Sequence, residues 1–161
     1  MSIVHFRLDH RLIHGQVALA WSKVTNPNHI IIANDVVCND ELQKSLLKMA
    51  APKQVRVSIH DVDKVIAYLN RGLQPNERVF LLVNNTSDAL KLIQNVDAIK
   101  EINIGNMTKK EGSEKLTEKI FVTEAEKTDI QEMIDNGALV YFQVLPNDGK
   151  EDFKDILKRR V

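Results

Sequence analysis

Short apolar runs alternate with amphipathic segments along almost the whole chain, and this alternation restricts the fold more than any other feature of the sequence. The apolar runs are rich in β-branched residues and predict strands at 3–8, 29–33, 55–59, 78–83, 102–104, 120–122 and 139–144. Apolar side chains at helical spacing predict helices that begin near Gly15, Asp40, Asp61, Asp88, Glu124 and Asp152. Asn39 or Asp40 is expected to cap the second of these helices and Asp61 the third. Strands separated by helices of about ten residues require crossover connections and a mostly parallel sheet covered on both faces. The sequence therefore predicts an α/β fold of the doubly wound class.

Length and charge favour one domain that does not bind nucleic acid. A chain of 161 residues should bury roughly 70% of its unfolded surface, so a single domain over 1–161 is expected. The 22 basic side chains are balanced by 22 acidic ones, whereas a duplex-binding domain would carry a basic excess. No stretch approaches the roughly 20 apolar residues of a membrane helix, so we expect a cytoplasmic protein that reaches the membrane only through a partner. The single cysteine, Cys38, excludes an internal disulfide, and no residues at metal-ligand spacing predict a metal site.

The segment 7–17, R-L-D-H-R-L-I-H-G-Q-V, lies between the first expected strand and the first expected helix and concentrates groups that can bind phosphate. A helix that begins near Gly15 directs unpaired N–H groups and about half a positive charge at this segment. Such a helix end attracts anions, phosphate above all. Arg7 and Arg11 would add two guanidinium groups, and Gly15 would let a ligand approach the backbone. His14 is therefore well placed to accept a phosphoryl group.

The same segment resembles the active-site loop of the IIB proteins of the mannose, fructose and sorbose family of the sugar phosphotransferase system. The matching positions are Arg7, Asp9, Arg11, His14, Gly15 and Gln16. The resemblance covers the rest of the chain more loosely, includes an I-N-I-G-N stretch at 102–106, and implies the three-layer α/β/α fold of the family. It also implies that the chain is a protein-histidine–sugar phosphotransferase without a cofactor. Its partners would be a phosphorylated IIA protein or domain, which donates the phosphoryl group, and the membrane IIC and IID components, which carry the sugar.

The resemblance assigns the reaction to His14, with Nδ1 as the expected attacking nitrogen, and gives its neighbours supporting roles. Arg7, Arg11 and the backbone N–H groups after His14 would hold the phosphoryl oxygens, which together carry about −1.5 to −2 charges at neutral pH. We expect both arginines to be exposed at the site. Asp9 would orient Arg11 or His14, or only form a turn. Gln16 would donate to a phosphate oxygen or face water.

Other polar residues are expected to lie close to this loop, because ligands of doubly wound sheets bind outside the carboxyl ends of the strands. Asn34 and Asp35 follow the second strand and form either an Asx turn or part of the rim of the site. Thr86 and Ser87 are expected to cap the helix after the fourth strand, with an anion contact as a secondary role. His10 departs from the family, which often has an acidic residue at this position, and it places a second imidazole in the loop.

Two other functions share parts of this pattern. Histidine phosphatases and mutases also place a histidine before a glycine after a first strand, but there an arginine directly precedes the histidine, where this chain has Ile13. The second alternative is a non-catalytic regulatory α/β module that binds phosphate or a nucleotide. It is weakened by the lack of G-x-G-x-x-G and G-x-x-x-x-G-K-[ST] motifs. The sugar stays open among mannose, fructose, sorbose and N-acetylgalactosamine, because selectivity in this system belongs largely to the membrane subunits.

Three features outside the loop have structural interpretations. Residues 108–118 carry Gly112 and several charges and are expected to form an exposed loop. His5 and His29 lie in or at the start of strands and are expected to be structural. The last helix is expected to extend from 152 to 160.

The second expected helix has Leu42, Leu46 and Met49 on one face. An apolar helix face that is buried in a core has the same sequence pattern as one that is buried between subunits. The sequence therefore leaves the oligomeric state open, including a homo-oligomer.

Overall fold

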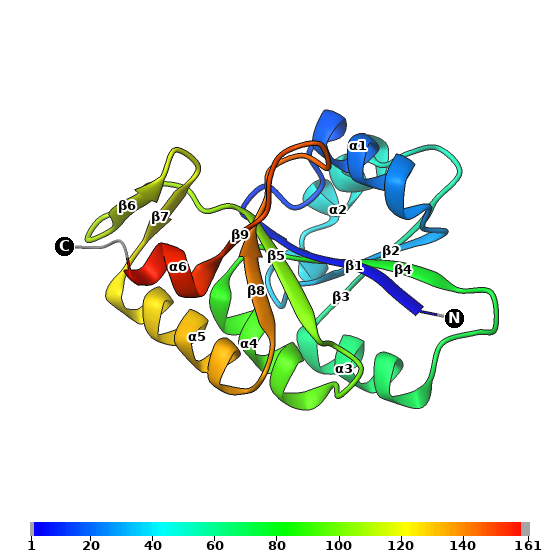
Figure 1. Ribbon diagram of the computed structural model, residues 1–161. Helices are drawn as coiled ribbons and strands as arrows, with labels where there is room; N and C mark the ends of the chain where they lie inside the picture. Colours follow the sequence, from blue (N-terminus) through cyan, green and yellow to red (C-terminus); the bar gives the residue numbers. More distant parts are fainter. Residues whose placement is uncertain (1, 159–161) are drawn as a thin grey trace.

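The computed structural model describes residues 2–158, which form a seven-stranded sheet between two layers of helices (Figure 1). The strand order is β3-β2-β4-β1-β5-β8-β9, and all neighbours are parallel except β8 and β9. The strands of this sheet are β1 (Ser2–Asp9), β2 (His29–Ala33), β3 (Arg56–His60), β4 (Arg78–Val83), β5 (Glu101–Asn106), β8 (Leu139–Phe142) and β9 (Glu151–Asp152). The helices are α1 (Gly15–Thr25), η1 (Val37–Asn39), α2 (Glu41–Ala50), α3 (Val62–Arg71), α4 (Thr86–Asn95), α5 (Glu124–Asp135) and α6 (Phe153–Lys158). The predicted α/β fold with a mostly parallel, doubly wound sheet is confirmed.

The two helical layers seal separate cores on the two faces of the sheet. Helices α1 and α2 lie on one face, while α3, α4 and α5 lie on the other (Figure 1). The first core combines side chains of α1 and α2 with one set of strand side chains, and it includes Trp21, Ile30, Ile32, Leu47, Phe80 and Leu82. The second core includes Val65, Leu81, Leu92, Ile104, Ile130 and Phe153. Because the parallel strands are covered on both faces, their sequences are continuous apolar runs, not alternating ones.

Short polar residues set where the helices begin. Asp40 accepts from the N–H of Gln43, and Asp61 accepts from the N–H of Lys64, so both predicted caps are confirmed. The prediction that Thr86 and Ser87 cap α4 is wrong. Asn85 takes that position, and its side chain accepts from the N–H of Asp88.

The predictions for two segments in the second half of the chain also need correction. Residues 108–118 are not wholly a loop, because Glu114–Thr117 forms β6 and pairs antiparallel with β7 (Ile120–Val122). Gly112, at a φ of +75°, permits the turn before β6, and Leu116 packs against the second core, which holds the hairpin in place. The last helix begins one residue later than expected, after the short edge strand β9, and positions 159–160 of the prediction lie outside the described residues.

His5 is buried between aromatic rings in the first core, which confirms its structural role. Its ring stacks on Trp21 with 4.1 Å between centroids and meets the ring of Phe80 edge-on at 5.2 Å. Burial, and then the positive charges of Arg7 and Lys150, lowers the pKa of His5 to about 3. The imidazole is therefore neutral in the folded protein at neutral and mildly acidic pH.

Acid should destabilise the protein through this buried imidazole. In the unfolded chain His5 titrates near 6.5, so below that pH the unfolded state binds a proton that the folded state excludes. The stabilising effect of neutral His5 is thus complete above pH 6.5 and is lost progressively as the pH falls toward 3. Around pH 4.5 the free energy of unfolding should fall with pH more steeply in the wild type than in His5→Phe, by about 1.4 kcal/mol per pH unit. Urea unfolding of both proteins between pH 4 and pH 7, roughly the range over which the two forms should diverge, measures the difference.

The control for this experiment is His60→Phe. His60 ends β3 and is exposed, so this variant removes an imidazole without disturbing the ring cluster around His5. Parallel curves for the wild type and His5→Phe would show that His5 is protonated in the folded state and would contradict the prediction.

Candidate functional site

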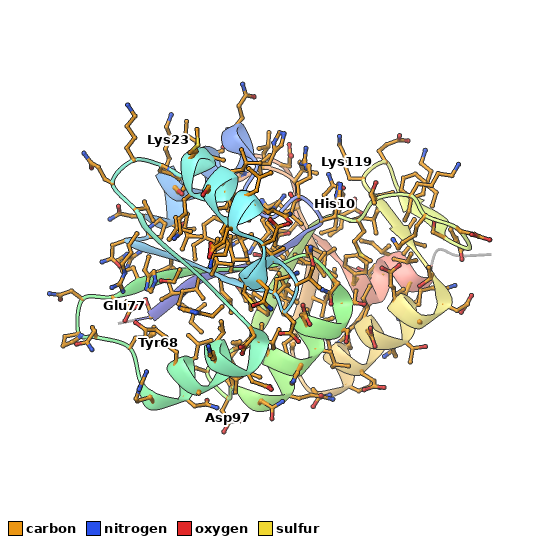
Figure 2. The ribbon with its side chains drawn as sticks, turned by 180° about the vertical axis from the view of Figure 1, so that it is seen from behind. His10, Lys23, Tyr68, Glu77, Asp97 and Lys119 are labelled. Atoms are coloured by element: carbon orange, nitrogen blue, oxygen red, sulfur yellow. The ribbon has the colours of Figure 1, made fainter. Side chains whose placement is uncertain are left out.

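The loop between β1 and α1 lies at the carboxyl ends of the parallel strands, at the point where the strand order reverses. β1 lies between β4 and β5. Strands β2, β3 and β4 are on one side of it, and β5, β8 and β9 are on the other. Figure 2 shows His10 of this loop at the same end of the molecule as Lys119 of the β6–β7 hairpin, and far from Tyr68 and Glu77 at the opposite end. This is the edge at which doubly wound sheets bind ligands.

The carboxylate of Asp9 shapes the loop. Its Oδ1 accepts from the backbone N–H of Arg11 at 3.0 Å and from Arg11 Nε at 3.4 Å. The backbone carbonyl of Asp9 accepts from the N–H of Leu12, which has a φ of +60°. A left-handed leucine is strained by about 1 to 2 kcal/mol, and the burial of Leu12 and Ile13 in the first core holds it in place. The loop is therefore tied down on both sides of its turn.

Beyond Ile13 the chain turns outward, and His14 is exposed as the N-cap of α1. Its side chain makes no capping hydrogen bond, and the first turn of α1 contains no acidic residue. The carbonyl of His14 accepts the first helical bond, from Ala18, so the N–H groups of Gly15, Gln16 and Val17 face the loop without a helical acceptor. A Cβ on Gly15 would meet no atom within 4 Å, so packing does not require a glycine there. The bare backbone instead leaves room for a ligand beside His14.

The expected exposure of Arg7 is wrong, because its side chain is 1% exposed and lies beneath the loop. It belongs to β1, which lies in the middle of a sheet covered on both faces, so side chains on either face of this strand are buried. Its Nη1 donates to the backbone oxygen of Gln143 at 3.0 Å, and its Nη2 lies 3.6 Å from Asp9 Oδ2. The guanidinium carbon is 5.6 Å from the centre of the Trp21 ring. Arg7 therefore supports the loop from below instead of forming its surface.

A close approach of β5 leaves space for the buried guanidinium. A Cβ on Gly105 would come within 2.0 to 2.5 Å of three guanidinium atoms of Arg7, so only glycine fits at this position. Burial lowers the pKa of Arg7 to about 10, although the negative charge of Asp9 opposes the shift. The side chain thus keeps its charge at neutral pH and contributes positive potential below His14.

The remaining loop residues lie at the surface, where they can reach a ligand. Arg11 has 35% of its side chain exposed and is oriented by Asp9, and Gln16 is exposed in the first turn of α1. His10 is exposed, and its Nδ1 lies 3.2 Å from Asn106 Oδ1 at the end of β5. The site therefore contains one guanidinium at the surface and one below it, with two imidazoles on the outside.

The three expected rim residues have structural roles. Asn34 Oδ1 accepts from the N–H groups of Val36 and Val37, which makes the segment an Asx turn. Asp35 Oδ1 accepts from the N–H of Val62 at the start of α3. Thr86 is 2% exposed and donates to Asp129 on α5, so it does not line the rim.

Sequence reasoning missed the segment 143–150, which rises beside the β1–α1 loop (Figure 1). Trp21 Nε1 donates to the carbonyl of Val144 at 2.9 Å, and the amide of Gln143 donates to the carbonyls of Pro146 and Asp148. Gln143 is itself buried directly after a core strand. Two signals in the sequence were available. Gln143 is a polar residue in an expected core strand, and Gly105 is a glycine inside a strand.

A doubly wound α/β protein with an exposed histidine at the positive end of a helix has the geometry of a phosphoryl-group acceptor. Residues 3–161 match the family described as PTS system sorbose subfamily IIB component. The sorbose-specific EIIB component of Klebsiella pneumoniae is 34% identical over 155 residues, which are 96% of this chain and 94% of that protein. The mannose-specific EIIAB component of Escherichia coli K12 is 32% identical over 153 residues, which are 95% of this chain and 47% of that protein. The crystal structure of the IIBSor domain of the Klebsiella pneumoniae sorbose permease has a TM-score of 0.94 at 33% sequence identity and covers 100% of this chain and 99% of that one.

The chain therefore belongs to the sorbose family of IIB components of the sugar phosphotransferase system. Members of this family are phosphotransferases that transfer a phosphoryl group in sugar uptake and work with IIA and membrane IIC and IID components. Within residues 2–158, no helix is both long and apolar enough to cross a membrane.

The buried arginine should contribute mainly to folding. Arg7→Ala removes the fully buried cation beside Asp9 and should lower the free energy of unfolding by about 3 to 5 kcal/mol. Gly105→Ala should also destabilise, because its Cβ collides with the Arg7 side chain. In Arg7→Ala/Gly105→Ala the collision is absent, so the loss should be clearly smaller than the sum of the two single losses.

Denaturant unfolding of the three variants forms a double-mutant cycle, with Arg11→Ala as the control. Arg11 is partly exposed, so its removal should cost no more than about 1 kcal/mol. Equal small losses for Arg7→Ala and Arg11→Ala, or strict additivity with Gly105→Ala, would contradict the buried support role.

Proposed function

We propose that His14 accepts a phosphoryl group from a phosphorylated IIA protein and passes it to a sugar that enters through the membrane IIC and IID components. The observation that supports this most directly is the exposed N-cap position of His14. It combines a nucleophile that a second protein can reach with backbone donors that can hold an anion. We further propose that the chain works in the cytoplasm beside the membrane permease.

The start of α1 would hold the phosphoryl oxygens. Most N-cap residues are Ser, Thr, Asp or Asn, because an oxygen of their side chain accepts from the second or third N–H of the helix. His14 offers no such oxygen, but a phosphoryl group on its ring brings three. The N–H groups of Gln16 and Val17 would then donate to phosphoryl oxygens, with Arg11 as the adjacent side-chain donor and the buried charge of Arg7 as longer-range support.

The transfer itself requires position and charge more than proton chemistry. The lone pair of His14 Nδ1 attacks the phosphorus of the donor phosphohistidine, and the bond from phosphorus to the donor nitrogen breaks as the new bond forms. The proton on His14 Nε2 stays in place, and the donor imidazole recovers its lone pair. In the second transfer a sugar hydroxyl attacks the same phosphorus and gives its proton to solvent water, while the bond from phosphorus to Nδ1 breaks and leaves neutral His14. Fixed donors near His14 stabilise the charge on the transferred group in both steps.

The comparison with the mannose-specific EIIAB component supports a IIA donor, since that protein carries an A and a B component under one name. The sugars named for relatives of this chain differ, being sorbose and mannose. The groups that surround His14 are phosphate-binding ones, namely the N–H groups at the start of α1 and the guanidinium of Arg11. We therefore propose that the membrane components select the sugar.

The first test is phosphorylation of the acceptor. After incubation with a phosphorylated IIA protein of this family, intact mass measurement should show one added phosphoryl group on the wild type, and this group should be labile to acid. His14→Ala should abolish it, whereas His10→Ala should keep it with a modestly slower rate. His10 is the matched control because it is the other exposed imidazole of the same loop.

Three results would count against the proposal. Phosphate that survives in His14→Ala and disappears in His10→Ala would move the acceptor to His10. Phosphate that survives in both variants would place the acceptor outside the loop. A wild type that binds phosphate reversibly without any covalent addition would favour the non-catalytic regulatory module.

A second test measures whether the backbone N–H groups at the start of α1 bind the phosphoryl group. If phosphoryl oxygens accept from α1, phosphorylation of His14 should cap the helix and stabilise the protein by about 0.5 to 2 kcal/mol. The amide proton signals of Gln16 and Val17 should move downfield and exchange more slowly with solvent. Amide signals of Lys64, at the start of α3, serve as the control and should not move, because Asp61 already caps that helix. Unchanged signals of Gln16 and Val17 in the phosphorylated protein would show that α1 does not hold the phosphoryl group.

A further inference from the structure

Exposed apolar side chains are confined almost entirely to one of the two helical layers. Within residues 2–158, the large apolar side chains that are exposed on this side belong to α1, to α2 and to the turn before α2, and they are Leu19, Val24, Val36, Leu42, Leu46 and Met49. The outer surfaces of α3, α4 and α5 expose mainly charged and amide side chains. Contiguous exposed apolar side chains are typical of protein–protein contacts, so the side with α1 and α2 is the one expected to contact another protein.

The apolar residues of α2 form one continuous stripe. Leu42, Leu46 and Met49 are spaced by four and three residues, so they share a face of the helix, and they are 71%, 56% and 81% exposed. Only Leu47 of this helix is buried, against the first core. Val36, at 76% exposure, lies just before the helix. The periodicity that predicted this helix therefore comes largely from a face that the fold of one chain does not cover.

We propose that α2 pairs antiparallel with α2 of a second copy of this chain, about a twofold axis near Leu46. In this arrangement Leu42 of one copy meets Met49 of the other, and the two Leu46 side chains meet each other. An isologous contact of this kind requires a self-complementary patch, which a stripe of similar apolar side chains provides.

The charges beside the stripe favour this occupant over an unrelated protein. Glu41 lies at the start of α2, where its exposed carboxylate is also 3.3 Å from Lys44 of the same helix. Lys48 lies near the end of α2, and helical geometry places Glu41 and Lys48 on the same side of the stripe. In an antiparallel pair, Glu41 of each copy lies opposite Lys48 of the other, which gives two symmetric pairs of opposite charge. The two helix dipoles also run in opposite directions.

The contact should be weak and should leave the catalytic loop free. The α2 stripe and Val36 supply only part of the roughly 800 Å² per partner that a stable interface buries, so dimerisation should depend on concentration. α2 connects β2 to β3 at one side of the sheet, while β4 separates these strands from β1 and its His14 loop. Phosphorylation of His14 thus does not depend on this pairing, and failure of one proposal leaves the other intact.

Sedimentation velocity of the full chain from micromolar to millimolar concentration tests the proposal. We expect a monomer–dimer equilibrium in the wild type. Leu46→Asp should raise the dimer dissociation constant at least about tenfold, because the two new carboxylates meet at the twofold axis. The control is Ala67→Asp, which adds the same charge to the exposed side of α3 and should leave the equilibrium unchanged.

A charge exchange then tests the antiparallel arrangement. Glu41→Lys and Lys48→Glu should each weaken the dimer severalfold by placing like charges opposite each other, and the double variant should recover it. Circular dichroism checks that α2 stays folded in every variant. A wild type that remains monomeric, a dimer that resists Leu46→Asp, or a double charge exchange that brings no recovery would each overturn the proposal.

Discussion

A buried ion pair between Arg7 and Asp9 lies beneath the loop that carries His14, and the shape of the loop depends on it. Removing two charges from water is costly, and the cost is offset only where the charges lie close together and find further partners. Arg7 has Asp9, the carbonyl of Gln143 and the face of Trp21. Asp9 in turn holds the backbone and side chain of Arg11. The ion pair therefore connects β1, α1 and the segment after β8 to the turn that positions His14.

The loop combines an anchored interior with an accessible tip. Leu12 and Ile13 are buried, Leu12 in a left-handed conformation, and the next residue emerges at the end of a helix. A phosphoryl acceptor needs both properties. It has to be reached by a second protein, and its phosphoryl group has to meet donors that are already in place, because donors that must first be ordered stabilise a transition state less. The strain in Leu12 is small beside the burial that maintains it.

The two helical layers differ in their surfaces, although both cover the same sheet. One layer presents polar side chains, and the other presents the apolar stripe of α2. The loop that carries His14 opens at a third surface, the carboxyl edge of the sheet. A protein that exchanges a phosphoryl group with changing partners benefits from this separation, because a contact on the α2 side leaves the edge with His14 free.

The sequence alone determined the architecture and indicated the loop that we propose to carry the reaction. Apolar runs that are covered on both faces and helices with short polar caps are local properties, so the order of strands and helices and the caps at Asp40 and Asp61 could be predicted. The loop was recognisable because its residues are contiguous. Only the tertiary structure decided which side of the surface each of these residues occupies. Arg7 is buried because β1 turns it toward β5, where Gly105 leaves space, and Thr86 is buried because α5 packs over it. The apolar face of α2 is exposed because one layer of helices needs only Leu47 from that helix to close the first core. Burial depends on residues that are distant in the sequence, and a local pattern of polar and apolar side chains does not contain that information.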